Sequence, residues 1–230
     1  MLLCLAACGA EPRPAVSRAW PVMGTMMSVA GWGPDSARIV VALSAARDSI
    51  DHIDSLLQRR VRIAALDSLQ RDVRRRTGIV LPVDSIAFGY ALDRAALALR
   101  GIVDSALLDV GGQYLWIGPA EKATHRSVGI PDPANSLVAL AAVELQSGSV
   151  RTQGAGRETR GGGGGRARSV TVLAPDGLTA NAWSIVLLQL GCDSALSPSR
   201  GLSVVCADSA GVRWTTELAK RVALPTARVP

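Results

Sequence analysis

The sequence predicts an α+β fold, a single domain in which mainly antiparallel strands pack against helices. Several segments have apolar residues at helical spacing, whereas shorter apolar runs lie next to glycine-containing turns and predict antiparallel strands. Helices and strands follow one another without the strict alternation of a parallel sheet, which favours the α+β class. With 230 residues, of which 48% are hydrophobic, the chain is long enough to bury the core of one such domain.

The first predicted elements are a strand and a long helix. Residues 21–32 predict a strand, because Met23, Met27 and Val29 fall on one face of an extended chain. Asp35 then caps a helix whose apolar residues form one stripe, for which core packing is the expected role. The stripe consists of Ile39, Val40, Leu43, Ile50, Ile53, Leu56 and Leu57.

A second helical segment and a short strand precede the centre of the chain. Residues 58–77 are helix-like and carry the densest group of basic residues, at residues 71–76, where positive charge suits the end of a helix. The net charge is +6, but aromatic residues are absent from this group. We therefore expect a solvated helix end and no nucleic-acid partner. Residues 78–82 predict the short strand.

The centre of the chain combines a helix with a pair of strands. Residues 85–99 have apolar residues at helical spacing, with Asp84 or Ser85 as the N-cap and a glycine as the stop. Two short apolar runs follow, at residues 106–110 and 113–117, and a pair of glycines separates them. Adjacent glycines are typical of the tight turn of a β-hairpin.

The last part of the chain predicts further strands and one more helix. The helix covers residues 179–190 and ends at Gly191. Residues 157–168 contain five consecutive glycines, for which a plain flexible loop is favoured over a phosphate-binding loop. The strand candidates are residues 127–130, 137–145, 149–151, 169–173, 202–207 and 212–215.

Five motifs occur in the order typical of one protein family. They read MGT at residues 23–25, IAFGYALDRAA at 86–96, LDVGG at 108–112, VGIPDP at 128–133 and LTANAWSI at 178–185. The second is similar to the pattern I-A-K-G-Y-A-x-D-x-A, the third to a strand ending in x-x-G-G, and the fourth to x-x-I-x-x-P. By these motifs the chain resembles the FAD:protein FMN transferase family, also called the ApbE family. The segment between its first helix and the IAFGY helix is shorter than in typical relatives, so it resembles an abbreviated member.

The resemblance implies an enzyme that moves FMN from FAD to a threonine or serine hydroxyl of an exported flavoprotein, with release of AMP. Residues 21–230 would form this flavin transferase domain. FAD, the substrate, would be held by the MGT motif, the central helix and the glycine turn. The implied flavin-binding residues are Met23, Gly24, Thr25, Asp84, Tyr90, Gly111 and Gly112.

The resemblance also implies a magnesium site, which is altered in this sequence. Its three ligand positions hold Ala87, through the backbone carbonyl, and Asn181 and Ile185 in place of an aspartate and a threonine. Hard cations prefer anionic oxygen ligands, so the first change removes a charge and the second removes a ligand. We expect Mg²⁺ binding to be weak or lost. Phe88 also stands where the family usually has a lysine.

Other implied features of the reaction are altered as well. The family's H-x-x-D/N-P-x-T-G segment should lie between residues 154 and 169, yet that interval contains no histidine. His52 and His125 are expected to be surface or packing residues, and Asp93 either assists the reaction or pairs with Arg94 on the surface. The sequence therefore predicts impaired activity. The alternatives are a non-catalytic flavin-binding or scaffold lipoprotein, and a truncated product that does not fold stably.

The N-terminal sequence LAAC, at residues 5–8, resembles a bacterial lipobox, so we expect a lipid on Cys8. Residues 1–20 would be the lipoprotein signal and tether, and the protein would be anchored to the membrane in the bacterial cell envelope, on the periplasmic or outer face. Cys192 and Cys206 either form a disulfide in an oxidising compartment or remain buried thiols, and their spacing leaves both alternatives open.

Overall fold

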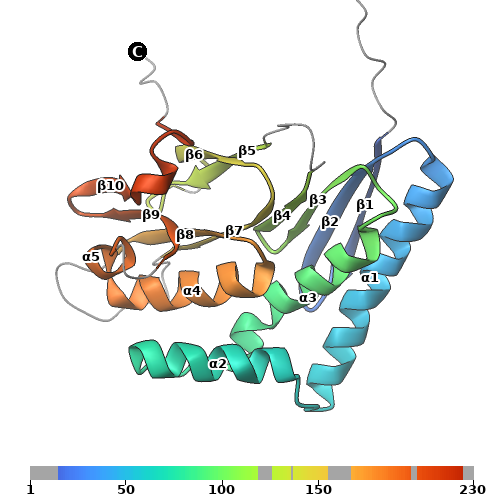
Figure 1. The fold of residues 1–230 in the computed structure, drawn as a ribbon, viewed down its shortest axis with the longest axis horizontal. Coiled ribbons are helices and arrows are strands. Elements are labelled where there is room, and N and C mark those ends of the chain that lie inside the picture. Colours follow the sequence, from blue (N-terminus) through green and yellow to red (C-terminus); the bar gives the residue numbers. More distant parts are fainter. Residues whose placement is uncertain (1–14, 119–125, 136, 155–166, 198–200, 225–230) are drawn as a thin grey trace, which may run out of the picture.

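An eight-stranded antiparallel sheet forms the centre of the computed structural model, which describes residues 15–118, 126–135, 137–154, 167–197 and 201–224. The strand order is β1-β2-β3-β4-β7-β8-β9-β10 (Figure 1). The strands are β1 (Ala15–Val22), β2 (Thr25–Trp32), β3 (Ser105–Val110), β4 (Gln113–Ile117), β7 (Gly148–Gly154), β8 (Ser169–Ala174), β9 (Ser203–Asp208) and β10 (Gly211–Trp214). Every neighbouring pair is antiparallel, as the sequence predicts.

A smaller three-stranded sheet packs on one face of the large sheet. It has the order β11-β6-β5, with β5 (Arg126–Pro131), β6 (Ala139–Leu145) and β11 (Val222–Ala223). Buried residues of both sheets, among them Trp116, Ile130 and Val143, form a shared core. In Figure 1 this sheet and the main helices lie on opposite sides of the large sheet.

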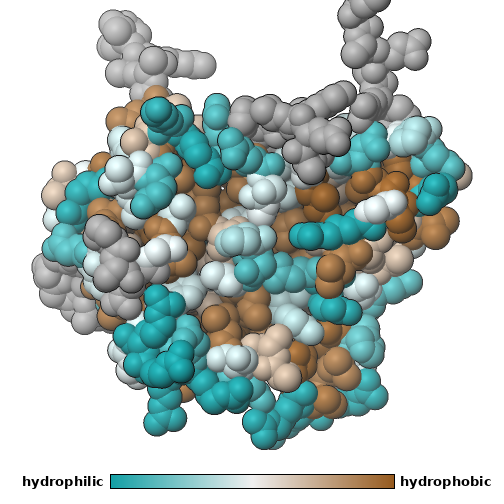
Figure 2. All heavy atoms as spheres, in the orientation of Figure 1, coloured by the Kyte–Doolittle hydropathy of each residue, from teal (hydrophilic) through white to brown (hydrophobic). Residues whose placement is uncertain are grey.

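Helices cover the other face of the large sheet. They are α1 (Ser36–Gln58), α2 (Ala64–Thr77), α3 (Val83–Leu99), α4 (Gly177–Leu190) and the short α5 (Cys192–Ala195). The 3₁₀ turn η2 (Thr216–Leu218) lies on the side of the small sheet, where Leu218 is part of the shared core. The side chain of Asp35 accepts the N–H groups of Ala37 and Arg38 at 3.0 Å, which confirms the predicted cap of α1. Hydrophilic residues gather over α2 in Figure 2, as expected for a solvated basic helix end.

Helices α3 and α4 cross at two glycines. A Cβ atom built on Gly177 would lie 2.6 Å from the carbonyl oxygen of Gly89, and one built on Gly89 would lie 2.9 Å from the Cβ of Asn181 and closer still to the carbonyl of Gly177. No side chain fits at either position, so the glycines allow the two helices to approach closely. This contact places the N-terminus of α4 beside the middle of α3.

The predicted fold class is confirmed, but two segments differ from the prediction. The single strand expected over residues 21–32 is a hairpin, β1–β2, which turns at Met23 and Gly24 with φ of 47° and 73°. A methionine at positive φ gives no turn signal in the sequence. Residues 15–20, expected in the tether, are part of β1.

The strand expected over residues 78–82 is absent from the described part of the chain. Gly78 ends α2 in the left-handed conformation with φ of 75°, and the next residues lead without strand pairing into α3. That helix begins at Val83 after Pro82, before the expected caps Asp84 and Ser85.

Cys192 and Cys206, for which the sequence allows either a disulfide or two thiols, form a disulfide. Cys192 in α5 and Cys206 in β9 are both buried, with their Cα atoms 5.6 Å apart. The bond joins the end of the helical layer to the large sheet.

Among the described residues, none of the helices combines the length and the apolar character that crossing a membrane requires.

Candidate functional site

A cavity of about 520 Å³ opens between the large sheet and the β5–β6 hairpin. The large sheet contributes the glycine turn between β3 and β4 together with residues of β4 and β7. The smaller sheet contributes mainly apolar residues from β5, β6 and the segment between them. The lining residues are Gly111, Gly112, Tyr114, Val150, Arg151 and Thr152 on one side, and Val128, Gly129, Pro131, Leu137, Val138 and Ala139 on the other.

The glycine turn is held from two sides. Gly111 and Gly112 have φ of 56° and 76°, a conformation that residues with a Cβ atom rarely adopt. The carboxylate of Asp109 accepts the Gly112 N–H at 2.9 Å, and the Gly111 N–H donates to the carbonyl of Met26 at 3.2 Å. Both amides of the turn are therefore engaged within the protein and are not oriented to bind a phosphate.

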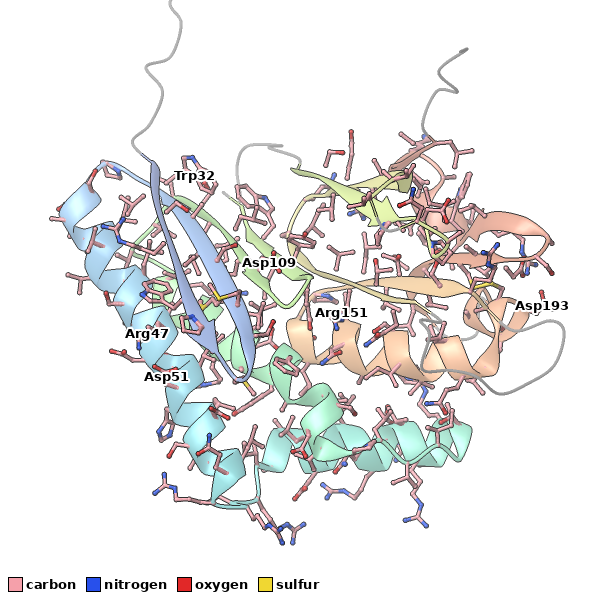
Figure 3. The ribbon with its side chains drawn as sticks, turned by 180° about the vertical axis from the view of Figure 1, so that it is seen from behind. Trp32, Arg47, Asp51, Asp109, Arg151 and Asp193 are labelled. Carbon is pink, nitrogen blue, oxygen red and sulfur yellow. A yellow bond between two sulfur atoms is a disulfide. The ribbon has the colours of Figure 1, made fainter. Side chains whose placement is uncertain are left out.

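Arg151 crosses from β7 to this turn, and Figure 3 shows it near Asp109. Its Nη1 donates to the carbonyl of Gly111 at 2.6 Å. Its Nε is buried and has no hydrogen-bond partner among the described residues. Burial lowers the pKa of Arg151, while the Asp109 carboxylate raises it, and an arginine remains protonated under such conditions. The cavity wall thus carries a positive charge.

The structure brings together two of the implied flavin-binding segments. Thr25 lies against the glycine turn, because a Cβ atom built on Gly111 would be 3.2 Å from the Thr25 Oγ1. The MGT and GG motifs therefore meet at one end of the sheet. Asp84 does not join them: it is exposed and lines a separate cavity of about 220 Å³ between α1, α2 and α3. Tyr90 is half-buried and packs against the hydrophobic core on both sides of α3.

Asp93 binds the N-terminus of α4. Its carboxylate accepts the N–H groups of Gly177 at 2.5 Å and of Leu178 at 2.9 Å, so it is not paired with Arg94 on the surface as one alternative had it. Burial raises the pKa of Asp93 to about 6, against the opposing effect of these two hydrogen bonds. Asp93 therefore links α3 to α4 at the glycine crossing.

Gln113, the first residue after the glycine turn, reinforces the same crossing. It is fully buried, and its Nε2 donates to the carbonyl of Gly177 at 2.7 Å and to the hydroxyl of Ser149 at 3.1 Å. Sequence reasoning missed Gln113, Asp109 and Arg151. For Asp109 and Gln113, the signal that could have identified them is a polar residue in an otherwise apolar strand, since such residues are rarely buried without a partner.

The residues at the implied magnesium positions do not fit a metal site. The side-chain amide of Asn181, which is 1% exposed, donates its Nδ2 to the carbonyl of Ser85 at 3.1 Å. Ile185 packs against the core around Trp183, and Ala87 is buried within α3. Across the described residues, no three His, Cys, Asp or Glu side chains come together as a metal site would require.

Several features fall outside the site or outside the described residues. His52 is exposed on α1, and Phe88, a residue of α3, packs against the hydrophobic core. Cys8, His125 and the glycine run at residues 161–165 lie outside the described residues.

Comparisons with known proteins agree with this architecture. The model of the ApbE family matches residues 21–202. Similar solved structures include the flavin transferase ApbE from Vibrio cholerae, with a TM-score of 0.68 and 13% identity over 91% of this chain and 100% of that chain. The apo flavinyl transferase ApbE of Pseudomonas stutzeri has a TM-score of 0.63 and 15% identity over 90% and 98% of the two chains. No curated protein sequence matches the chain. Because the family model covers most of the chain, the protein belongs to the ApbE family.

Proposed function

We propose that this protein is an FAD:protein FMN transferase, which moves FMN from FAD to a threonine or serine hydroxyl of an exported flavoprotein and releases AMP. Membership of the ApbE family supports this function, and so do the flavin transferases among its structural neighbours. We further propose that the transfer is slow, because the residues at the implied metal positions do not fit Mg²⁺.

The observation that carries the proposal is the cavity beside the glycine turn. FAD joins a flat aromatic ring to a chain of anionic phosphates, so its site needs an apolar wall and a positive charge. The β5–β6 side supplies Val128, Pro131 and Val138, and the β7 side supplies the Arg151 guanidinium. A guanidinium donates charge-assisted hydrogen bonds to phosphate oxygens.

The transfer requires the acceptor hydroxyl oxygen to bond to the FMN phosphorus while the bond from that phosphorus to the AMP oxygen breaks. The acceptor proton must leave, and positive charge must stabilise the negative charge on the phosphate oxygens. The cavity supplies one guanidinium for the charge. Divalent cations assist such reactions in other enzymes, and their implied positions here hold an amide and an aliphatic side chain. With one guanidinium and no metal ligands at these positions, the transfer of FMN would be slow.

A second function, a non-catalytic flavin-binding or scaffold lipoprotein, is favoured by one specific observation. The Asn181 amide is already bonded to the Ser85 carbonyl, and Ile185 is part of the core. These positions stabilise the packing of α4 on α3. A protein of this kind would bind FAD in the same cavity and would leave it intact.

We also propose that the protein is anchored in the bacterial cell envelope by a lipid on Cys8. The LAAC sequence supports the anchor, and the Cys192–Cys206 disulfide supports export, because disulfides persist in oxidising compartments. The acceptor flavoprotein would then be an exported protein on the same side of the membrane.

The test is a transfer assay with the full-length protein in detergent. The protein is incubated with FAD and a threonine-containing exported flavoprotein domain, and both AMP release and covalent flavin fluorescence of the acceptor are measured over time. The proposal predicts slow AMP release that matches the flavin incorporated, and none with an acceptor whose threonine is replaced by alanine. Bound but intact FAD would support the non-catalytic function. An absence of FAD binding would contradict both.

A further inference from the structure

Arg151 is the only charged residue among the described residues that line the cavity beside the glycine turn. The remaining lining residues are glycines, apolar side chains, a tyrosine and a threonine. The threonine, Thr152, shares a hydrogen bond of 2.8 Å with the hydroxyl of Thr171. Among the described lining residues, Arg151 therefore provides the one cationic group that a negatively charged ligand in the cavity can contact.

The guanidinium is held in place by one of its nitrogens. Its Nη1 is fixed on the Gly111 carbonyl at 2.6 Å, which limits the rotation of the group. Its Nε is buried and unpartnered among the described residues. The Nε is closed off from the cavity, but a guanidinium has five N–H donors and the bond to Gly111 uses only one of them, so the outer N–H groups remain for a ligand in the cavity.

The other polar groups of the glycine turn are engaged within the protein. Asp109 is near enough to raise the pKa of Arg151, but its Oδ1 accepts the Gly112 N–H. The Gly111 amide donates to Met26. The turn therefore cannot hold an anion through its own N–H groups, and the guanidinium is the group left to do so. A guanidinium matches the oxygens of a phosphate better than any other side chain.

We propose that Arg151 binds a phosphate group of the flavin nucleotide and so makes the cavity select FAD and FMN over riboflavin. This inference rests on the proposed function, because it presumes that the cavity takes a flavin. Arg151 acts here as a specificity-determining residue, and its contact with phosphate does not depend on Mg²⁺.

The test compares three ligands on the full-length protein. FAD, FMN and riboflavin are titrated by flavin fluorescence, in buffer without Mg²⁺, against the wild type and the variants Arg151→Gln and Arg151→Lys. The exposed Arg94→Gln serves as the matched control, because it removes one arginine from outside the cavity. We expect Arg151→Gln to weaken FAD and FMN binding at least tenfold and to leave riboflavin binding unchanged. Arg151→Lys should show an intermediate loss, since lysine keeps the charge without the planar fork.

Two outcomes would overturn the inference, and they are distinguishable. An equal loss of riboflavin and FMN binding in Arg151→Gln would mean that Arg151 only supports the glycine turn, and the proposed function would stand. No binding of any flavin by the wild type would overturn the inference together with the proposed function. If Arg151→Gln does not fold, Arg151→Lys decides: it must bind FMN more weakly than the wild type and riboflavin equally well.

Discussion

Asp109 and Arg151 hold the same glycine turn: the Asp109 carboxylate accepts the Gly112 N–H at 2.9 Å, and the Arg151 guanidinium donates to the Gly111 carbonyl at 2.6 Å. The turn is thus bound by an anionic side chain from β3 and a cationic side chain from β7. This arrangement fixes the guanidinium at the cavity wall.

The crossing of α3 and α4 predicts a sensitive position for stability. Gly89→Ala should destabilise the protein by about 1–3 kcal/mol, because the new methyl group would overlap the backbone of Gly177. The free energy of unfolding from urea titration measures this. Gly154→Ala is the control, since a Cβ atom there meets nothing within 4 Å. Equal stability of the two variants would contradict the close crossing, and a broad, non-cooperative transition in the wild type would contradict a stably folded domain.

The Asp93 carboxyl predicts a pH dependence of stability. Its pKa is about 6 in the folded protein, above its ordinary value of 3.8, so the folded state binds more protons between these two values. This contribution to stability is present below pH 3.8 and is lost as the pH rises through 6, by about 3 kcal/mol in total. Urea titrations from pH 4 to pH 7 should show the slope in the wild type and a smaller one in Asp93→Asn.

An exposed carboxylate provides the control for that experiment. Asp51→Asn, which removes a surface ion pair with Arg47, should keep the slope of the wild type. If Asp93→Asn kept the full slope, another group would be responsible, and the link between Asp93 and the N-terminus of α4 would not titrate as described.

The helices and most strands could be predicted from the sequence, because apolar spacing and glycine turns are local signals. The turn at Met23 was missed, since a methionine at positive φ looks like any strand residue. Contacts between distant segments have no local signal: Asp93 meets Gly177 across 84 positions. Arg151 was missed for a related reason, because its role depends on the β3–β4 turn that pairing brings beside it.

The disulfide predicts a strong effect of reduction. The bond between Cys192 and Cys206 closes a loop with a sequence separation of 14. A cross-link over a loop of this size stabilises the folded state by about 3 kcal/mol. Thermal unfolding with and without dithiothreitol should show a lower Tm in the reduced protein. The double variant Cys192→Ala with Cys206→Ala should have a low Tm in both conditions. A Tm that reduction leaves unchanged in the wild type would mean that the bond does not form.

The altered metal positions predict a gain of function. The double change Asn181→Asp with Ile185→Thr restores the ligand types that the family uses, but it places a buried carboxylate opposite the Ser85 carbonyl. Without Mg²⁺ this variant should be less stable than the parent by about 1–3 kcal/mol. Added Mg²⁺ should raise its Tm and its AMP release, and should leave the parent unchanged. If the activity does not increase, the absent histidine segment limits the reaction more than the metal site does.

FAD binding by the purified full-length protein, measured by flavin fluorescence with and without Mg²⁺, tests the proposed function most directly. Saturable binding with the same affinity in both conditions is expected, because Asn181 and Ile185 do not fit a metal and Arg151 supplies the positive charge. Binding that depends on Mg²⁺ would contradict the description of the metal positions. An absence of binding in both conditions would contradict the proposal that the cavity beside the glycine turn holds a flavin nucleotide.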